Sequence, residues 1–369
     1  MPTPVPHGDI DYGELARLGL TPHDIIDFSA NSNPYGPHPA VLAAIRAAVT
    51  APVLRHYPDR DCLALRQAIA AAEAIDPALI LPTNGANELI QLVALAFIKP
   101  GSRHLILSPT FGEYARAVQV MGGQVLPYFA SPPDYQHDVE QIAALIRRYR
   151  PETIWLCNPN NPTGQYLSLA TLNELRALAQ TEALWVVDES YQYFSAFEES
   201  LGRHWVATGG ETNLVVLRSL TKEHGLAGLR LGFAIAAPER IERLRVAQPA
   251  WSVNSLAQVA GVAALQPAVR AEQRRNITQL LAHAADLWRD LADAGFKLLP
   301  TTTSYALIQT GQAALTRQKL LQHRLLVRDG TSFGLPEYVR IAAQRPEQNR
   351  RLIAAMKEME VGSKKWSNS

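Results

Sequence analysis

One lysine in this chain stands where a side chain could carry out covalent chemistry. Lys222 lies in SLTKEHGLAGLRLGF (residues 219–233), directly after the apolar run 214–217. Such a run predicts a buried strand, and open α/β sheets bind their ligands at the carboxyl ends of strands. A lysine amine attacks carbonyl groups when burial or neighbouring positive charge lowers its pKa. Lys222 is therefore a candidate nucleophile, and a solvated loop lysine is the alternative interpretation.

Three further motifs place polar residues beside apolar runs. NGANELIQLVALAF (84–97) starts with turn and cap residues before apolar positions at helical spacing, so its first backbone N–H groups suit a phosphate. CNPNNPTG (157–164) fixes Asn161 in a turn. WVVDESY (185–191) ends an apolar run with Asp188, a carboxylate that needs a cation or hydrogen-bond donors if it is buried. Taken singly, an ordinary N-cap, a tight connection and a structural ion pair explain these motifs too.

Alternating strands and helices must position these motifs. The predicted strands are 104–108, 153–157, 184–187, 213–217 and 231–236, with helical patterns at 138–149 and 168–180 among those between them. Continuous apolar strands separated by helices indicate a mainly parallel sheet that is covered on both faces. Long helical patterns (252–265 and 268–295) and then short strand-like runs (FKLLP, SYALIQT and YVRIAA) follow.

We therefore predict an α/β fold in which a large domain with a mostly parallel sheet is joined to a smaller α+β domain. The predicted boundaries are an N-terminal arm over 1–35 that packs with the small domain, a large domain over 36–245, a small C-terminal domain over 246–360 and a tail over 361–369. The arm is inferred from its many prolines and asparagines.

Composition excludes several classes of protein. The 369 residues are 47% hydrophobic and 19% charged, with a formal net charge of +1, so neither nucleic acid nor a membrane surface is an expected partner. The two cysteines, Cys62 and Cys157, have neither disulfide-framework nor metal-ligand spacing, so we expect no metal site and a reducing cytoplasm. The start MPTPVPHGDIDYG does not read as a signal peptide, and no apolar run is long enough to cross a membrane.

Together and in this order, NGAN, PNNPTG, DESY and SLTK…GLR resemble the fold-type I pyridoxal-phosphate enzymes of the class I/II aminotransferase superfamily. The resemblance extends from about residue 26 to about residue 356. It implies an aspartate-aminotransferase-like fold, an enzyme, and pyridoxal 5'-phosphate as cofactor. A non-catalytic effector-binding domain of the same fold is the alternative of another class. Such domains usually follow a DNA-binding module, for which the residues before 26 leave no room.

The resemblance also implies catalytic residues. Lys222 would form a Schiff base with the cofactor aldehyde and then move the proton at the substrate Cα. Asp188 would pair with the pyridine nitrogen and keep it protonated. Tyr191 and Asn161 would hydrogen-bond the ring 3-oxygen.

The resemblance also implies residues that bind the cofactor ring, the cofactor phosphate and the substrate. Phe111 would stack on the pyridine ring, and Arg340 would hold the substrate carboxylate or an equivalent group. Tyr57 would reach the cofactor phosphate of a neighbouring subunit, which implies a homodimer with shared active sites. The phosphate would be cradled by Gly85, Ala86, Asn87, Ser219 and Arg230.

Two reactions are implied most closely. TKEHGLAGLRLGF and VRDGTSFGLPEYVRIA (327–342) are similar to histidinol-phosphate aminotransferase, in which Arg328 would bind a substrate phosphate. PHGDI and DFSANSNPYGP resemble threonine-phosphate decarboxylase, a lyase, and make His7, Asn33 and Tyr35 further candidates for that phosphate. We take the aminotransferase as the main hypothesis.

Two acidic residues depart from both patterns. Asp9 replaces the second glycine of a His-Gly-Gly signature, and Glu223-His224 follows the lysine where small, apolar or aromatic residues are usual. Carboxylates facing the pocket would repel a phosphate and suit a cationic substrate. A third hypothesis is therefore elimination and cyclisation of a basic, arginine-type amino acid, similar to capreomycidine synthase, with His224 or His7 as acid or base. The alternative is that both carboxylates face solvent or a nearby arginine.

Overall fold

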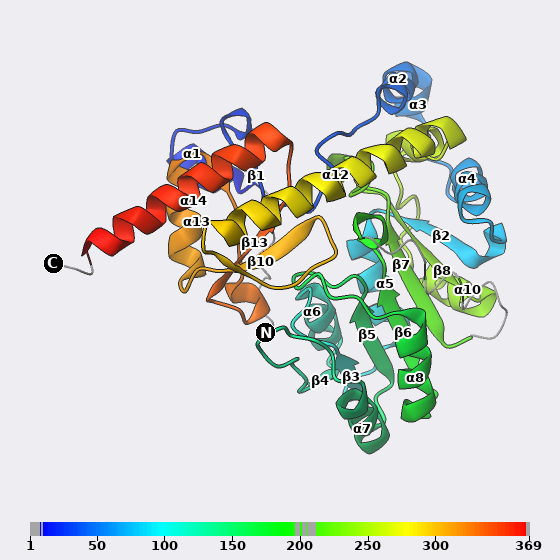
Figure 1. The fold of residues 1–369 in the computed structure, drawn as a ribbon. Coiled ribbons are helices and arrows are strands. Elements are labelled where there is room, and N and C mark those ends of the chain that lie inside the picture. The colour runs from blue at the N-terminus through cyan, green and yellow to red at the C-terminus, as the bar shows by residue number, and fades with distance from the viewer. Residues whose placement is uncertain (1–7, 9, 196–199, 201–203, 205–211, 367–369) are drawn as a thin grey trace.

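The computed structural model describes residues 8, 10–195, 200, 204 and 212–366, and its centre is a seven-stranded sheet (Figure 1). Within these residues, β8 alone runs antiparallel to the other strands of that sheet. In spatial order the strands are β2 (Ile80–Thr83), β8 (Gly232–Ala236), β7 (Leu214–Ser219), β6 (Leu184–Asp188), β5 (Thr153–Cys157), β3 (Arg103–Ile106) and β4 (Gln124–Leu126).

Helices cover both faces of this sheet, so its central strands are buried along their whole length. One face packs on α5 (Ala86–Phe97), α6 (Glu113–Val120) and α10 (Pro238–Ala247). The other packs on α4 (Leu63–Glu73), α7 (Val139–Tyr149), α8 (Leu169–Ala179) and α11 (Ser255–Ala264). The mainly parallel α/β sheet predicted from the sequence is therefore confirmed.

A second, antiparallel sheet is formed by the C-terminal part of the chain. Its order is β12 (Arg328–Asp329), β13 (Tyr338–Ala342), β10 (Tyr305–Gln309) and β9 (Lys297–Leu298). The long helix α12 (Pro267–Asp293) runs past both sheets, and α13 (Ala313–Gln322) and α14 (Pro346–Trp366) pack beside the smaller one (Figure 1).

The N-terminal segment is tied to this second sheet region. It contains α1 (Tyr12–Arg17) and β1 (Ile26–Asp27), and β1 pairs in parallel with β11 (Leu325–Leu326). Arg317 Nη1 donates to Glu14 Oε1 over 2.8 Å. The packing of the arm with a small domain stays a prediction, and these are the contacts it would use. Two helices, α2 (Pro39–Ala48) and α3 (Ala51–Arg55), then lead to the large sheet.

Other sequence predictions differ from the structure at their edges. Sequence analysis missed the two short strands β2 and β4. It also missed the reversed direction of β8, because residue propensity does not encode the direction of a strand. The predicted tail is wrong in part, since α14 continues to Trp366. Because α11 packs against α2 and α4, the chain covering the large sheet extends past residue 245, and the domain boundaries stay a prediction. Among the described helices, none has both the length and the apolar character to span a membrane.

Candidate active site

A cavity of about 600 Å³ lies at the carboxyl ends of the parallel strands and also touches β12 and β13. Its walls combine motifs that are far apart in the sequence, because parallel strands end at one edge of a sheet. The predicted site residues that line it are Ala86, Asn87, Phe111, Asn161, Asp188, Tyr191, Ser219, Lys222, Arg230, Arg328 and Arg340.

Asp188 is the last residue of β6 and is buried in the cavity wall. Its Oδ2 accepts a hydrogen bond from the Tyr114 hydroxyl over 2.7 Å, and its Oδ1 accepts one from the Ser190 N–H over 2.9 Å. Burial raises the pKa of Asp188, and the hydrogen bonds and the charge of Lys222 oppose that shift. A cation bound against this carboxylate would offset its burial further.

Aromatic rings form the wall beside this carboxylate. Phe111 and Tyr114 meet edge to face with ring centroids 5.7 Å apart, and Tyr191 packs against Tyr305 at 5.2 Å. Tyr114, in the first turn of α6 and three residues after Phe111, was missed in the sequence. Burial raises the pKa of the Tyr191 hydroxyl, which is therefore a hydrogen-bond donor at neutral pH.

Arg340, on β13, fixes Asn161 from the small-domain side. Its Nη1 donates to Asn161 Oδ1 and its Nη2 donates to the Ser29 carbonyl, while its buried Nε has no partner among the described residues. Because Arg340 occupies the amide oxygen, Asn161 can offer a ligand its Nδ2 donor.

The start of α5 forms an anion cradle with Arg230. Gly85 precedes the helix with φ = 81°, and a Cβ there would lie 2.6 Å from Arg230 Nη2, so the guanidinium occupies the space of a side chain. Ser219 and Thr221 lie nearby in the same cavity, with their hydroxyl oxygens 2.8 Å apart. N–H groups at a helix start, hydroxyls and a guanidinium together suit a phosphate.

A second group of cations stands on the neighbouring strands β12 and β13, where Arg328 and Arg340 are paired residues. Arg328 lies over the Phe333 ring at 5.1 Å, and its Nη2 donates to Ser332 Oγ over 2.5 Å. Burial, reinforced by the charge of Arg340, lowers the pKa of Arg328 to about 10. Among the residues that the structure describes, the charged side chains lining the cavity are these two arginines, Arg230, Lys222 and the carboxylate Asp188. This excess of positive charge favours an anionic ligand.

Four predicted substrate residues lie outside this cavity. Glu223 pairs with His224 over 3.2 Å, and both are buried behind Lys222 against a different small pocket. Glu73, more than Glu189 and Glu223, raises the pKa of the buried Arg218 nearby. Asn33 donates to the Glu223 carbonyl, and the Tyr35 hydroxyl bonds His283 Nδ1 over 2.8 Å.

The interpretation of Glu223 and His224 as substrate residues is therefore corrected. The hypothesis of an enzyme for arginine-type amino acids required a carboxylate in the pocket, and Glu223 does not provide one. His7 and Asp9 lie outside the described residues.

Tyr57 does not contact this chain's own cavity. It is 77% exposed and stacks on Trp251 with ring centroids 4.3 Å apart. A side chain this exposed is available to a second subunit.

Asn31 was missed and lines the cavity instead of Asn33. Its Nδ2 and Oδ1 are buried, without a hydrogen-bond partner among the described residues. The amide lies near enough to Tyr191 to lower the pKa of its hydroxyl against the larger effect of burial, so it can bond that hydroxyl or a ligand. The motif SANSNP contains both asparagines, and nothing in its local pattern distinguishes them.

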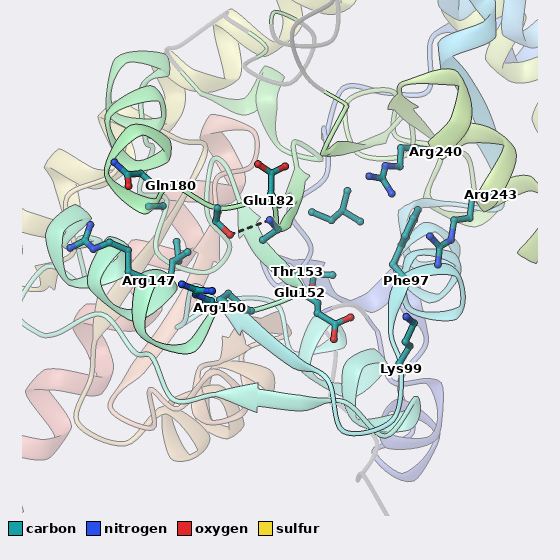
Figure 2. A pocket seen from close by; sticks show the side chains of 16 residues that line it. Phe97, Lys99, Arg147, Arg150, Glu152, Thr153, Gln180, Glu182, Arg240 and Arg243 are labelled. Carbon is teal, nitrogen blue, oxygen red and sulfur yellow. Dashed lines mark hydrogen bonds between the residues drawn. The ribbon is translucent and has the colours of Figure 1, made fainter.

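A larger groove of about 780 Å³ lies near the starts of β5 and β6, and Figure 2 shows charged side chains of both signs spread around it. Arg147 donates to the Leu178 carbonyl and Arg240 to the Thr212 carbonyl. Cations at helix C-termini are favoured by the helix dipole, which accounts for Arg147 and Arg150 at the end of α7. This groove is therefore not the candidate active site. Its charged residues are Lys99, Arg147, Arg150, Glu152, Glu182, Arg240 and Arg243.

Comparisons with known proteins agree with this geometry. A family model described as aminotransferase class I and II matches residues 23–356. Histidinol-phosphate aminotransferase of Moorella thermoacetica is 33% identical over 94% of this chain and 88% of its own length. Histidinol-phosphate aminotransferase 2 of Ralstonia nicotianae is 34% identical over 93% of this chain and 91% of its own.

Solved structures share the fold. L-threonine-O-3-phosphate decarboxylase from Porphyromonas gingivalis has a TM-score of 0.77 and 29% identity over 90% of this chain and 97% of its own. Histidinol-phosphate aminotransferase from Sinorhizobium meliloti, solved with pyridoxal-5'-phosphate, has a TM-score of 0.82 over 95% of this chain and 94% of its own. At 22% identity, the latter is similar in fold alone.

Proposed function

This chain belongs to the class I and II aminotransferase family, and on that premise we propose that it is an aminotransferase of the histidinol-phosphate type. Enzymes of this family depend on pyridoxal phosphate. The observation that carries the substrate class is the second group of cations, Arg328 and Arg340, which is separate from the cradle at α5. One anion site suits the cofactor phosphate, and the other suits an anionic group of the substrate.

The residues of the cavity fit this cofactor. The raised pKa of Asp188 marks a buried carboxylate that a protonated ring nitrogen would balance. The start of α5, the Ser219 hydroxyl and Arg230 offer donors to a phosphate, and Phe111 offers a ring face. When bound, pyridoxal phosphate supplies an electron sink for negative charge at the substrate Cα.

Each polar side chain then has a separate task. Lys222 would hold the cofactor covalently through its amine and, once released, would take and return the proton at the substrate Cα. Asn161 and Tyr191 would donate hydrogen bonds to the ring oxygen. Arg340, which also holds Asn161, binds an anionic group of the substrate and so orients the Cα bond that breaks.

A product assay tests the reaction type. We expect the purified holoenzyme to transfer the amino group of histidinol phosphate to at least one member of a panel of 2-oxo acids, followed by mass spectrometry. Release of carbon dioxide, or loss of water with the amine retained, in place of this transfer would contradict the proposal.

Arg328 provides a test of the substrate phosphate. Replacing it with alanine removes a charge-assisted contact worth about 1.5–3 kcal/mol, so KM for histidinol phosphate should rise about 10- to 100-fold. The same change should barely affect turnover of unphosphorylated histidinol. The matched control is Arg324→Ala, which removes an exposed arginine that pairs with Asp24 over 3.1 Å. An equal loss for both substrates would rule out phosphate binding by Arg328.

Threonine-phosphate decarboxylation is the second candidate, and the N-terminal segment favours it. A Cβ at Gly8 would lie 2.6 Å from the Ser29 carbonyl oxygen and 3.2 Å from Arg340 Nη2, so this glycine is packed closely over the substrate arginine. Gly8 belongs to the PHGDI motif that resembles the decarboxylase arm. Carbon dioxide release from threonine phosphate, without amino transfer from histidinol phosphate, would favour this candidate.

We further propose a homodimer in which Tyr57 completes the site of the partner, and subunit mixing tests it. The Lys222→Ala variant should be inactive. The activity of Tyr57→Ala should fall about tenfold, as expected for the loss of one hydrogen bond to a charged group. Refolding the two variants together should restore about a quarter of wild-type activity, because half of the random dimers are mixed and each contains one complete site. If Tyr57 acted within its own subunit, mixing would restore nothing.

A further inference from the structure

The backbone around Lys222 is held by hydrogen bonds from outside its own turn. Within the turn, the Gly225 N–H donates to the Lys222 carbonyl over 3.4 Å and the Leu226 N–H donates to the Thr221 carbonyl over 2.9 Å. The N-terminal arm adds three more. Asn33 donates its backbone N–H to the Lys222 carbonyl over 3.0 Å and its Nδ2 to the Glu223 carbonyl over 2.9 Å, and Ser32 Oγ donates to the Lys222 carbonyl over 3.4 Å. A single asparagine therefore bonds two consecutive carbonyls, beginning at the lysine itself.

Gln273 reaches the same place from α12. Its Nε2 also donates to the Glu223 carbonyl, so that one oxygen accepts from two side chains. Both donors are almost completely inaccessible to solvent, with Asn33 4% and Gln273 3% exposed. Buried hydrogen bonds of this kind are costly to leave unmade, so loss of either donor should loosen the turn.

The arm also presses directly on the next residues of the turn. A Cβ at Gly36 would lie 2.6 Å from the His224 carbonyl oxygen, so backbone packs against backbone there. Gly225 has φ = 62°, a conformation that glycine adopts without strain. The turn is thus enclosed on one side by the arm and on another by α12, while the Glu223 side chain pairs with His224 away from the cavity.

We propose that Asn33 and Gln273 are positioning residues for Lys222, which hold its Cα by bonding the carbonyls of Lys222 and Glu223. This inference rests on the catalytic role proposed for Lys222. A lysine side chain is long and flexible, so a fixed Cα restricts where its amine can reach. The predicted function of Asn33 changes accordingly, from binding the substrate to bonding the backbone that carries the lysine.

The test compares Asn33→Asp and Gln273→Met in the full chain, with and without cofactor. Asn33→Asp keeps the acceptor that the Tyr35 N–H uses over 3.0 Å and replaces the donor with a carboxylate oxygen, a change that the Asn349→Asp control shares. Gln273→Met removes the other donor at similar side-chain length and adds no charge. We expect faster hydrogen–deuterium exchange at the backbone amides of 220–226 in both variants. We also expect kcat to fall about 10- to 100-fold with KM within about threefold, because misplacement acts on the chemical step.

Asn349→Asp is the matched control. Asn349 is also buried, accepts from the Gln344 N–H over 2.9 Å and donates to the Gln344 carbonyl over 3.0 Å, away from Lys222. The Asn349→Asp variant should lower the melting temperature and change neither hydrogen–deuterium exchange at the backbone amides of 220–226 nor kcat. Unchanged exchange in the Asn33 and Gln273 variants, faster exchange with unchanged kcat, or an equal fall of kcat in Asn349→Asp would each overturn the inference.

The exchange measurement on the cofactor-free chain separates this inference from the proposed function. If Lys222→Ala kept full activity, the role of Lys222 would fail, whereas the exchange result would still report whether Asn33 and Gln273 hold the turn.

Discussion

Lys222→Ala is expected to lower kcat by at least about 10³-fold, because it removes both the covalent attachment and the group that moves the proton at Cα. The visible absorbance that arises from the bond between lysine and cofactor should disappear in the same variant. Stopped assays with histidinol phosphate and an absorbance spectrum of the purified protein measure the two effects.

Lys99→Ala is the matched control for this variant. Lys99 is an exposed lysine of the groove in Figure 2, remote from the cavity at the other ends of the strands. It should leave both the spectrum and kcat unchanged. Activity near wild type in Lys222→Ala would remove the basis for the proposed mechanism.

Asp188→Asn is expected to have the second largest effect. Removing one partner of a buried charge pair costs about 3–5 kcal/mol, which corresponds to a fall in kcat of about 150- to 5,000-fold. The asparagine keeps the shape of the side chain and removes the charge that would hold the ring nitrogen protonated. Single-turnover kinetics, at cofactor concentrations that keep the variant loaded, isolate this effect from weaker cofactor binding.

Stability provides the control for Asp188→Asn. Burial raises the pKa of Asp188, so the protein without cofactor bears a cost for this charge, and the neutral amide should not lower its melting temperature. Tyr114→Phe removes only one hydrogen bond to Asp188 and should cost about tenfold in kcat. A larger effect of Tyr114→Phe than of Asp188→Asn would contradict the assigned order of importance.

It was predictable from the sequence, for a physical reason, that the motifs at the strand ends lie together. Continuous apolar runs predict parallel strands, and parallel strands present their carboxyl ends at one edge. Asp188 at the end of β6, Ser219 at the end of β7 and Asn161 after β5 therefore had to be neighbours, and the structure places all three in one cavity.

Side-chain direction was not predictable in the same way. Asn31 and Asn33 differ by two positions in one motif, yet the first lines the cavity and the second bonds the Glu223 carbonyl. Glu223 adjoins Lys222 and pairs with its next neighbour, His224. The partner of Asn33 lies far along the chain and the partner of Glu223 is adjacent, and the local sequence pattern shows the direction of neither side chain.

The sequence by itself determined the residue types at the strand ends, because apolar periodicity marks where buried strands end. The family and the cofactor were implied by the resemblance of its ordered motifs to a known family. Only the tertiary structure decided which neighbours of Lys222 enter the cavity. It brought Arg328 and Arg340 on two antiparallel strands to the large sheet, and it placed Asn33 and Gln273 against the lysine turn. Burial requires each polar group to find a partner, and those partners are set by how the arm, α12 and the two sheets pack together.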